Sequence, residues 1–438
     1  MSRVNPKNKN NAGIGIHLHR HIPGVLSIAL LASGLQIHAQ DSTAVVLRRA
    51  DSFNMINEKI REVIGNVEFR QGNIFVSCDK AIQYLMMNRV ELRGNVRVIQ
   101  DTVTLTAPHG FYDGNTKIAS GDGGVTLNNG HMTINADSGI YLTKEKKAFF
   151  NRNMMVVDSA SVLLAHEGTY DQKKRKAECR GNVKVRSKTD NTIVYGNFLE
   201  HFDENNYTRI PDMPRLVRFD TTNETIDTLI IVSKLMESYD DSTKRFIASD
   251  SVRLLRGQTA ACAGKGTYYP GKDRIILESS PIVWYEQNQL SGDTIVITMK
   301  QRKLERIIVR GNAFAVSKSD SLTITRFNQL TGRDLTMEFL EGKIRRIVVE
   351  QTATSLYYLY EEQTPNGANK SSGDIITLLF SKGRLQDINV VGGVQGNYYP
   401  EKMVRGKEGD YNLAGFKWVT HRPSFRYIGD TIVEKDYE

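Results

Sequence analysis

Cysteine and histidine are scarce in this chain of 438 residues, which has three cysteines and nine histidines. Cys78, Cys179 and Cys262 are widely spaced and form no Cys-x-x-Cys pair, so a disulfide framework is excluded. The histidines beyond residue 40 share no metal-ligand spacing, so no metal site is expected. The sequence has no phosphate-binding P-loop motif either, and we expect no cofactor.

A long amphipathic helix is also missing beyond residue 40, apart from a weak helical pattern over residues 42–56. Short segments in which apolar and polar residues alternate, separated by turns, take its place. This pattern indicates an all-β protein.

The first 39 residues have the features of a secretory signal peptide. Basic residues without any acidic residue precede a short apolar run over residues 22–31, and residues 37–39 form an Ala-x-Ala-like cleavage site. The run is too short to span a membrane. We therefore predict a signal peptide over residues 1–39 and export to the periplasm, with peripheral attachment to the outer membrane as a further expectation. The alternative is a disordered basic tail.

Cleavage after Ala39 lowers the formal net charge from +9 to +5. A mildly basic chain suits an anionic partner without identifying one. The basic runs over residues 144–147 and 173–176 flank predicted strands, and we interpret them as solvated turn charges.

Five copies of one pattern, spaced 29 residues apart, occupy the first half of the chain. They begin at Gly65, Gly94, Gly123, Arg152 and Gly181, and the clearest copies have the form Gly-Asn-Val-x-Val. A fixed period of this size is typical of stacked repeats, in which each unit buries its apolar face against its neighbours. The pattern is therefore evidence about the fold before it is evidence about function.

Within each copy, apolar and polar residues alternate as in strands with one buried face. The Gly-Asn pair supplies the left-handed backbone that a tight corner requires. In most copies a small residue and then a tyrosine follow, as with Gly110 and Tyr112. We predict roughly three short strands per copy. The predicted fold class is therefore an all-β, repeat-built, solenoid-like stack of short strands with an apolar interior.

The pattern continues less regularly after residue 209. Further strand starts appear near residues 210–214, 251–252, 281–282, 311–312, 352–353 and 392–393. We predict a regular repeat region over residues 40–209, a second, less regular one over 210–400, and a C-terminal extension or cap over 401–438. Residues 361–372 are polar and contain Pro, Gly, Asn and Ser, so we expect an exposed loop there.

The chain resembles the OstA-like family, the periplasmic β-jellyroll proteins of lipopolysaccharide transport that include LptA and the periplasmic N-terminal part of LptD. The Gly-Asn-Val-x-Val strand starts, the strands Leu105–Ala107 and Ile134–Ala136, and the Tyr-Asp turns at Tyr112 and Tyr170 carry this resemblance. It is good over residues 60–200 and weaker over 200–400. The chain has about twice as many units as a minimal transport protein of this family.

The resemblance implies an open β-jellyroll of short antiparallel strands. Its apolar interior forms a groove that accepts acyl chains, while sugars and phosphates remain in water. The alternation is compatible with this, because the inward positions offer no side-chain hydrogen bonds. A closed β-solenoid core would produce the same pattern. The predicted lipid-binding residues are Val67, Phe69, Ile74, Val76, Val96, Val98, Val103, Leu105, Val125, Leu127, Met132, Ile134, Val156, Leu163, Val183 and Val185.

The expected function is therefore a non-enzymatic periplasmic protein that binds lipopolysaccharide or a similar lipid and takes part in its transport to the outer membrane. The expected partners are that lipid and other β-jellyroll transport proteins joined end to end, including an outer-membrane LptD-type protein, with no nucleic acid. One alternative is a secreted structural or adhesive solenoid. Another is a polysaccharide-acting β-helix enzyme, whose candidate groups are Asp137, Glu167, Asp171, His109 and His166.

Overall fold

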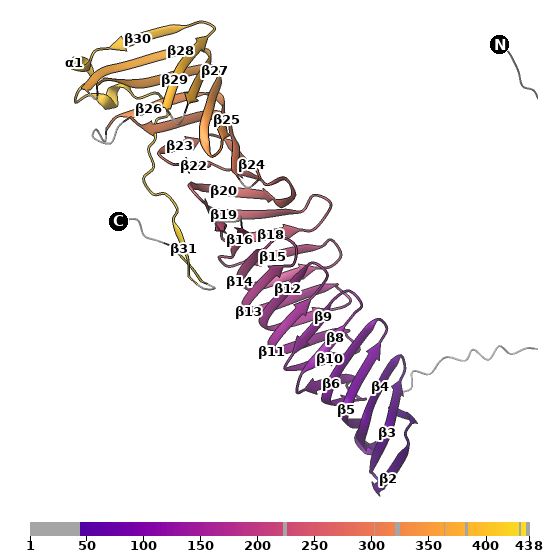
Figure 1. The fold of residues 1–438 in the computed structure, drawn as a ribbon. Coiled ribbons are helices and arrows are strands. Elements are labelled where there is room, and N and C mark those ends of the chain that lie inside the picture. Colours follow the sequence, from indigo (N-terminus) through magenta and orange to yellow (C-terminus); the bar gives the residue numbers. More distant parts are fainter. Residues whose placement is uncertain are drawn as a thin grey trace, which may run out of the picture. The chain divides into compact units, whose positions relative to one another are not determined.

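The computed structural model describes residues 44–221, 226–301, 303–319, 325–362, 364–381, 384–428 and 431–434. The predicted signal peptide lies outside these residues. Residues 42–438 form one unit, and its strands stack one after another from β2 to β30 (Figure 1). Of the described residues, 72% lie in strands and 4% in helices, which confirms the all-β prediction. Among the described residues, no helix is long and apolar enough to cross a membrane.

The first half of the stack consists of strands that pair with their neighbours in an antiparallel sense. These strands are β1 Val46–Arg49, β2 Ser52–Asn57, β3 Ile60–Gln71, β4 Ile74–Tyr84, β5 Arg89–Gln100, β6 Val103–Asp113, β7 Ile118–Asp122, β8 Val125–Asn128, β9 Thr133–Ala136, β10 Ser138–Leu142, β11 Lys147–Val157, β12 Ser161–Asp171, β13 Lys176–Ser187, β14 Thr192–Phe202 and β15 Tyr207–Pro211. The 3-10 turn η1 spans Leu85–Met87. The weak helical pattern over residues 42–56 was therefore a wrong indication, because β1 and β2 lie there.

The second half continues with strands of very different lengths, of which β25–β28 are the longest. They are β16 Arg215–Thr221, β17 Ile226–Val232, β18 Leu235–Tyr239, β19 Arg245–Arg256, β20 Thr259–Tyr269, β21 Arg274–Glu278, β22 Ile282–Tyr285, β23 Asn288–Ser291, β24 Thr294–Lys300, β25 Lys303–Lys318, β26 Phe327–Leu340, β27 Lys343–Glu361, β28 Thr364–Ser381, β29 Arg384–Val391 and β30 Gln395–Tyr399. After them come α1 Glu401–Val404 and the hairpin β31 Phe425–Ile428 with β32 Thr431–Glu434. The 3-10 turns η2 and η3 span Pro270–Lys272 and Glu408–Tyr411.

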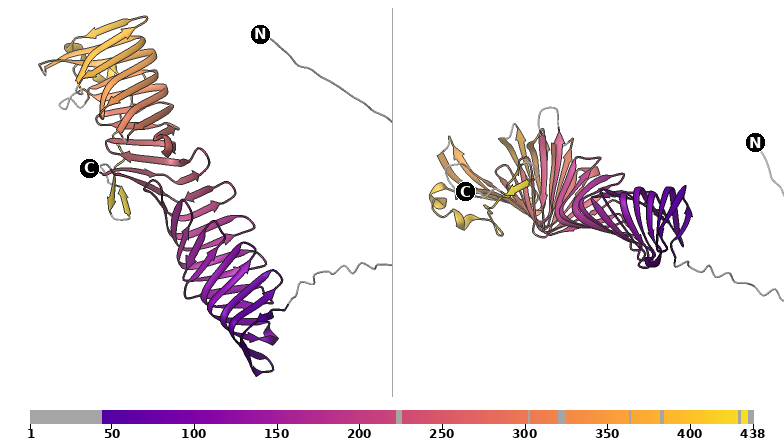
Figure 2. Two further views of the ribbon diagram at one scale, coloured as in Figure 1. Left: turned by 45° about the vertical axis from the view of Figure 1, so that its right-hand side comes forward. Right: turned by 90° about the horizontal axis from the view of Figure 1, so that it is seen from below.

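The long strands of the stack are bent once, and elsewhere the bend falls between two short strands. These bends divide the sheet into two walls. In β5, residues 89–93 form one arm and belong to what we call wall A, and residues 96–100 form the other arm and belong to wall B. Strand β6 pairs with both arms of β5, with a register shift between them. The repeat therefore consists of two long bent strands, or four arms, and not of the three short strands predicted. Figure 2 shows the strands following one another as ribs along the unit.

The bend lies at the predicted Gly-Asn corners. Gly94 and Asn95 have φ angles of 71° and 45°, in the left-handed region that glycine and asparagine tolerate best. The same pair of positive angles recurs at residues 65–66, 123–124, 152–153, 181–182, 212–213, 250–251, 279–280, 311–312, 351–352 and 392–393. The corner is thus the constant element of the repeat, even where the spacing or the residue type changes.

An aspartate braces several corners from the neighbouring strand. The side-chain amide of Asn95 donates to Asp79 Oδ2 at 2.9 Å, and Asn66 donates to Asp51 at the same distance. Asn153 and Asn312 contact Asp137 and Asp293 in the same way. This bond holds the exposed corner against the preceding strand.

A single hydrophobic cluster fills the space between the walls from Val45 to Ile376. A second cluster lies on the outer face of wall B near the C-terminal end of the stack, where Phe314 and Leu356 are buried under Val404 and Leu413. The predicted loop over residues 361–372 is wrong for this reason. Most of it belongs to β28, and Ala368 is fully buried within this second cluster.

Residues 401–425, which we call the C-terminal segment, run back along the outer face of wall B. The amides of Leu413 and Val419 each donate at 2.8 Å, to Oε1 of Gln329 and of Gln289 respectively. Phe425 packs against Val217 and its neighbours further along the stack. The segment therefore contacts strands over a large part of the second repeat region.

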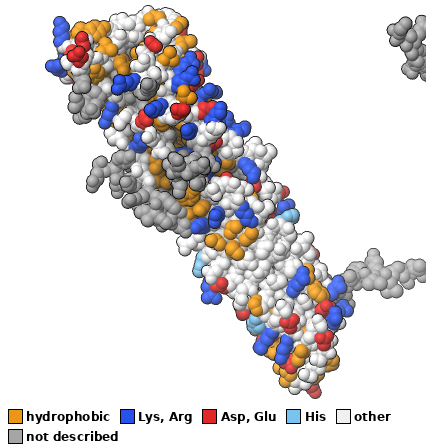
Figure 3. All heavy atoms as spheres, viewed as in Figure 1, with side chains coloured by type: hydrophobic (Ala, Val, Ile, Leu, Met, Phe, Trp, Pro, Cys, Tyr) orange, Lys and Arg blue, Asp and Glu red, His pale blue; other side chains and the backbone are white. Residues whose placement is uncertain are grey.

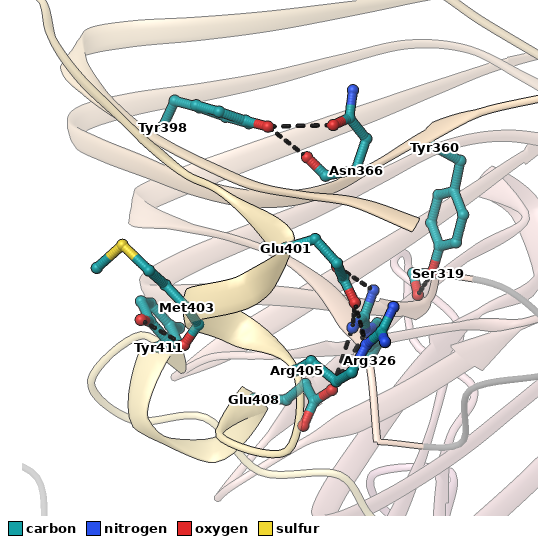
Figure 4. A network of polar contacts seen from close by, with 10 residues as sticks. All are labelled: Ser319, Arg326, Tyr360, Asn366, Tyr398, Glu401, Met403, Arg405, Glu408 and Tyr411. Carbon is teal, nitrogen blue, oxygen red and sulfur yellow. Dashed lines mark hydrogen bonds and ion pairs between the residues drawn. The ribbon is translucent and has the colours of Figure 1, made fainter. Parts of the chain in front are cut away.

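Arg326 anchors the beginning of this segment (Figure 4). Its guanidinium, 3% exposed, contacts Glu401 Oε1 at 2.8 Å and Glu408 Oε1 at 3.2 Å. The Arg326 bonds lower the pKa of Glu401. Burial raises the pKa of Glu408, but its backbone hydrogen bonds and Arg326 outweigh this and the net pKa is lowered. Both carboxylates are charged at neutral pH.

Candidate functional site

The predicted lipid-binding residues all lie between the two walls. Thirteen of the sixteen are buried, with exposed fractions from 0% for Val67 to 9% for Leu163. Met132, Val156 and Val185 are partly buried and pack against the same cluster. The alternation therefore placed these side chains on the inward face, while their contact with lipid remains a prediction.

Every one of these sixteen residues belongs to wall B, and the sequence reasoning missed the opposite wall. Val90 and Leu92 on wall A are each 1% exposed and face the same interior. The signal that could have found them is their position four and two residues before the corner at Gly94. The same offsets give Ala119, Gly121, Ala148 and Phe150 in the next two copies, and all four are buried.

The walls meet at the corners, and there the interior is narrow. A Cβ atom added at Gly139 on wall A would lie 3.1 Å from a methyl carbon of Val125, which follows the corner at residues 123–124. One added at Gly168 would lie 2.4 Å from the sulfur of Met154. The small residue that precedes each tyrosine in the repeat therefore makes room for the opposing wall.

Away from the corners, buried tyrosines on wall A bond to amide side chains on wall B. Tyr112 donates to Gln71 Oε1 at 2.6 Å, and Tyr141 donates to Gln100 Oε1 at 2.9 Å. The next such contact joins Asn129 Nδ2 to the Tyr170 hydroxyl oxygen at 3.0 Å. We call these contacts cross-wall bonds. They close the side of the interior that lies opposite the corners, which is the side an open groove would leave free.

Burial also fixes the chemistry of these tyrosines. Loss of solvation raises the pKa of Tyr112 to about 12, and it raises the pKa of Tyr141 and Tyr170 as well. The phenols therefore stay neutral at physiological pH. Tyr112 and Tyr141 act as hydrogen-bond donors, and Tyr170 accepts from Asn129.

The second repeat region closes the same side with other residue types. The guanidinium of Arg218 on wall B lies 5.8 Å from the ring centroid of Tyr268 on wall A, which occupies the Tyr112 position. Arg256 contacts Asp273 at 3.2 Å, and the Tyr285 hydroxyl donates to the carbonyl of Gly342. The closure therefore persists although the amide–tyrosine pairing does not.

The interior itself is tightly packed in this structure. A small cavity of about 10 Å³ lies within strands β16–β21, lined by apolar side chains such as Leu216, Met236 and Leu254, with Tyr268 beside them. That space admits about one water molecule. Acyl chains would therefore need the walls to separate or the side chains to rearrange. Any ligand there would have to be apolar, because the lining offers almost no polar surface.

A larger hollow of about 460 Å³ lies on the outer face of wall A, across β7 and β10–β13. Ser120, Phe149 and Thr169 form part of its lining, and the backbone of the buried glycines forms its floor. The lining mixes hydroxyl, carboxylate and aromatic groups without a convergent set of buried polar side chains. It does not join the interior site.

The candidate catalytic groups do not form one centre. Asp137 accepts from Asn153 in a corner contact, and His109 pairs with Asp122 at 3.2 Å. His166 packs against the corner at Gly181. A Cβ atom added to Gly181 would lie 2.8 Å from the Cβ atom of His166. These residues therefore have structural roles at separate corners. Of the others, Glu167 lines the outer hollow, while Asp171 accepts a hydrogen bond from a backbone amide in its own turn.

Both ends of the stack leave strand edges without partners among the described residues. At one end β1 and β2 pair only with β3, and at the other β29 and β30 pair only with β28. Phe53 and Met55 of β2 are 58% and 51% exposed, and Ile388 of β29 is 44% exposed. Figure 3 shows hydrophobic side chains at the β2 end of the molecule. Among the described residues, both ends of the stack therefore combine unpaired strand edges with exposed apolar side chains.

Two family models match this chain. Residues 42–195 match the OstA-like protein family, and residues 162–303 match the family described as LptA/(LptD N-terminal domain) LPS transport protein. None of the curated proteins matches significantly.

Among solved structures the chain is similar to LptH from Pseudomonas aeruginosa, the LptA homologous periplasmic component of that organism's lipopolysaccharide transport device. The identity is 15%, the match covers 27% of this chain and 81% of that chain, and the TM-score is 0.24. A TM-score this low supports no inference for the present chain. The two family models overlap and together cover residues 42–303, and this match supports the resemblance of the chain to the OstA-like family of lipopolysaccharide-transport proteins.

Proposed function

We propose that this protein carries lipopolysaccharide, or a lipid of similar design, through the periplasm towards the outer membrane, and that it does so without catalysing a reaction. Acyl chains would occupy the space between walls A and B. The sugar and phosphate part would remain outside in water. The export that this role requires agrees with the signal peptide expected over residues 1–39.

The observation that carries the proposal is the continuity of the interior. One apolar cluster extends from Val45 to Ile376 without a break, so a lipid tail would meet the same environment in every repeat. Each methylene of a tail that leaves water for such surroundings contributes about 0.8 kcal/mol. A chain of equivalent sites permits movement along the stack, because no single position is strongly preferred.

The unpaired strand edges at the two ends support an assembly of several such units. An exposed edge strand offers unpaired backbone groups to another strand. Phe53 and Met55 on β2 would be buried by a second β-jellyroll placed against this end. The proposed partners are therefore β-jellyroll transport proteins joined end to end, with an LptD-type protein at the outer membrane.

Photo-crosslinking in cells tests this function. A photoreactive amino acid is placed at Val98, Leu105 or Ile134, and at Arg97 as the outward control. We expect lipopolysaccharide adducts at the three inward positions and none at Arg97. Exported, folded protein without adducts at any inward position would refute the lipid-binding role.

A second candidate function follows from the tight packing of the interior. If the walls never separate, the cluster is an ordinary closed core, and the protein is a secreted structural or adhesive solenoid. The small size of the cavity within β16–β21, about 10 Å³, is the observation that favours this second function. The crosslinking experiment separates the two, because a closed core gives no adducts.

A further inference from the structure

The row of cross-wall bonds is interrupted in the middle of the stack. Strand pairing within wall A identifies the residues that are equivalent to the tyrosines of the cross-wall bonds. Ala177 lies opposite His201, just as Val90 lies opposite Tyr112. His201 therefore occupies the tyrosine position of this unit, and Asp158 occupies the position of Gln71 and Gln100. In the next unit, Ser238 occupies the tyrosine position and Ser187 occupies the glutamine position.

Neither of these pairs joins the walls. His201 Nδ1 lies 2.9 Å from Thr208 Oγ1 and its Nε2 lies 3.4 Å from Asp203, both on wall A. Asp158 accepts hydrogen bonds from the amides of Ala160 and Ser161 in its own turn. Among the described residues, the closure is thus absent between the Asn129–Tyr170 contact and the Arg218–Tyr268 contact.

The inward face of wall B is more exposed at this interruption than in the preceding units. One inward row of wall B lies next to the cross-wall bonds, and its members Phe69, Val98, Leu127 and Ile134 are 0–3% exposed. Further along the same row, Leu163 and Val194 rise to 9% and 8%, and Val156 and Val185 are only partly buried. We call this part of the row, residues 156–194, the side opening.

A basic turn lies at the rim of wall A beside the side opening. Lys173, Lys174 and Arg175 connect β12 to β13 and are all exposed. Lys173 Nζ donates to the carbonyl of Lys144 at 3.1 Å, which holds the two basic turns of this rim together. The following turn of wall A contains Asp203 and Glu204, so on wall A the positive charge lies on one side of the opening only.

We propose that the side opening is where acyl chains enter the interior from the side, and that the turn at residues 173–175 binds the phosphate-bearing head group of the same lipid. The inference rests on the proposed lipid-binding function and adds the place and the order of entry. Entry there breaks no cross-wall bond, whereas entry beside Tyr112 or Tyr141 requires one to break. Cationic side chains at the rim offset the cost of bringing an anionic head group to that place.

Time-resolved photo-crosslinking of the purified, full-length mature chain with dispersed lipopolysaccharide tests the proposal. Probes are placed at Val156 and Val185 in the side opening, and at Val98 under the intact bonds. We expect adducts at Val156 and Val185 before adducts at Val98. The double variant D158Q/H201Y installs the missing amide–tyrosine pair, and it should slow entry about fivefold, the effect of one ordinary hydrogen bond. Its matched control is Q100L/Y141F, which removes a bond away from the opening.

A second experiment tests the head-group site. The triple variant with Lys173→Ala, Lys174→Ala and Arg175→Ala should form adducts with lipopolysaccharide more slowly. Its rate of adduct formation with the phosphatase-treated lipid should be unchanged. Circular dichroism confirms the fold of each variant. Adducts at Val98 that appear first, or an unchanged rate in D158Q/H201Y, would overturn the side opening and leave the lipid-binding function intact. Adducts at none of the three positions would instead refute that function itself.

Discussion

The hydroxyl of Tyr141 on wall A donates to Oε1 of Gln100 on wall B at 2.9 Å, across the interior and across 41 residues of sequence. Both side chains are buried, with exposed fractions of 2% and 5%. Because the bond lies opposite the corner, it closes the side on which a simple groove would be open. A lipid that passes this point must leave the bond intact or replace it.

Tyr141→Phe should destabilise the protein by about 2 kcal/mol, because the buried amide of Gln100 loses its partner. The measurement is the free energy of unfolding in urea, with hydrogen exchange to locate the change in β10 and β5. The companion variant Q100L/Y141F removes both polar groups and should regain most of the loss. If the double variant were less stable than Tyr141→Phe, the loss of packing, and not of the hydrogen bond, would account for the change in the free energy of unfolding.

Asn95→Ala should destabilise the corner by about 1–2 kcal/mol, because alanine tolerates the φ of 45° poorly and loses the bond to Asp79. Arg152→Gly should instead stabilise the protein by about 1 kcal/mol, because Arg152 has a φ of 61°, which glycine adopts without strain. Thermal unfolding of both variants checks the prediction. If Arg152→Gly lowered the melting temperature, the contacts of the arginine side chain would outweigh its backbone strain.

The two ends of the stack should bind each other in a head-to-tail manner. Phe53→Lys with Met55→Lys blocks the β2 end, and Ile388→Lys blocks the β29 end. Each variant alone should fail to self-associate at concentrations where the native chain does, as measured by sedimentation velocity. An equimolar mixture should form dimers and nothing larger, because only one pair of native ends remains. Self-association of either single-end variant would show that like ends pair instead.

Acid should release the C-terminal segment. The pKa of Glu401 lies below its ordinary value of 4.5 because of its bond to Arg326, so this pair contributes stability above that pH and loses it as pH falls through the lowered pKa. We expect the amides of residues 401–425 to lose protection from hydrogen exchange below about pH 4, where glutamates begin to take up protons. Glu401→Gln should already show weaker protection at pH 7 and a smaller response to acid. An unchanged pH response in Glu401→Gln would assign the effect to Glu408 or to other groups.

The corners could be predicted closely because their cause is local. A left-handed backbone pair favours Gly-Asn, and the repeated Gly65, Gly94 and Gly181 show this directly in the sequence. The looser corners at Asp250–Ser251 and Gln351–Thr352 were located only to within a residue or two, since neighbouring strands impose the same backbone on less suitable residues. Wall A was missed because its inward residues Val90 and Leu92 precede the corner, whereas the most visible alternation follows it.

The sequence by itself determined the repeat, the corners and the inward face of wall B, because alternation and backbone preference act over a few residues. Only the tertiary structure decided that Tyr112 meets Gln71, that Ala368 lies in a buried strand and not in a loop, and that residues 401–425 cover the outer face of wall B. It also decided that His201 and Asp158 leave the side opening without a cross-wall bond. These contacts join residues tens of positions apart, and their partners are fixed by how the two walls face each other, which no local pattern encodes.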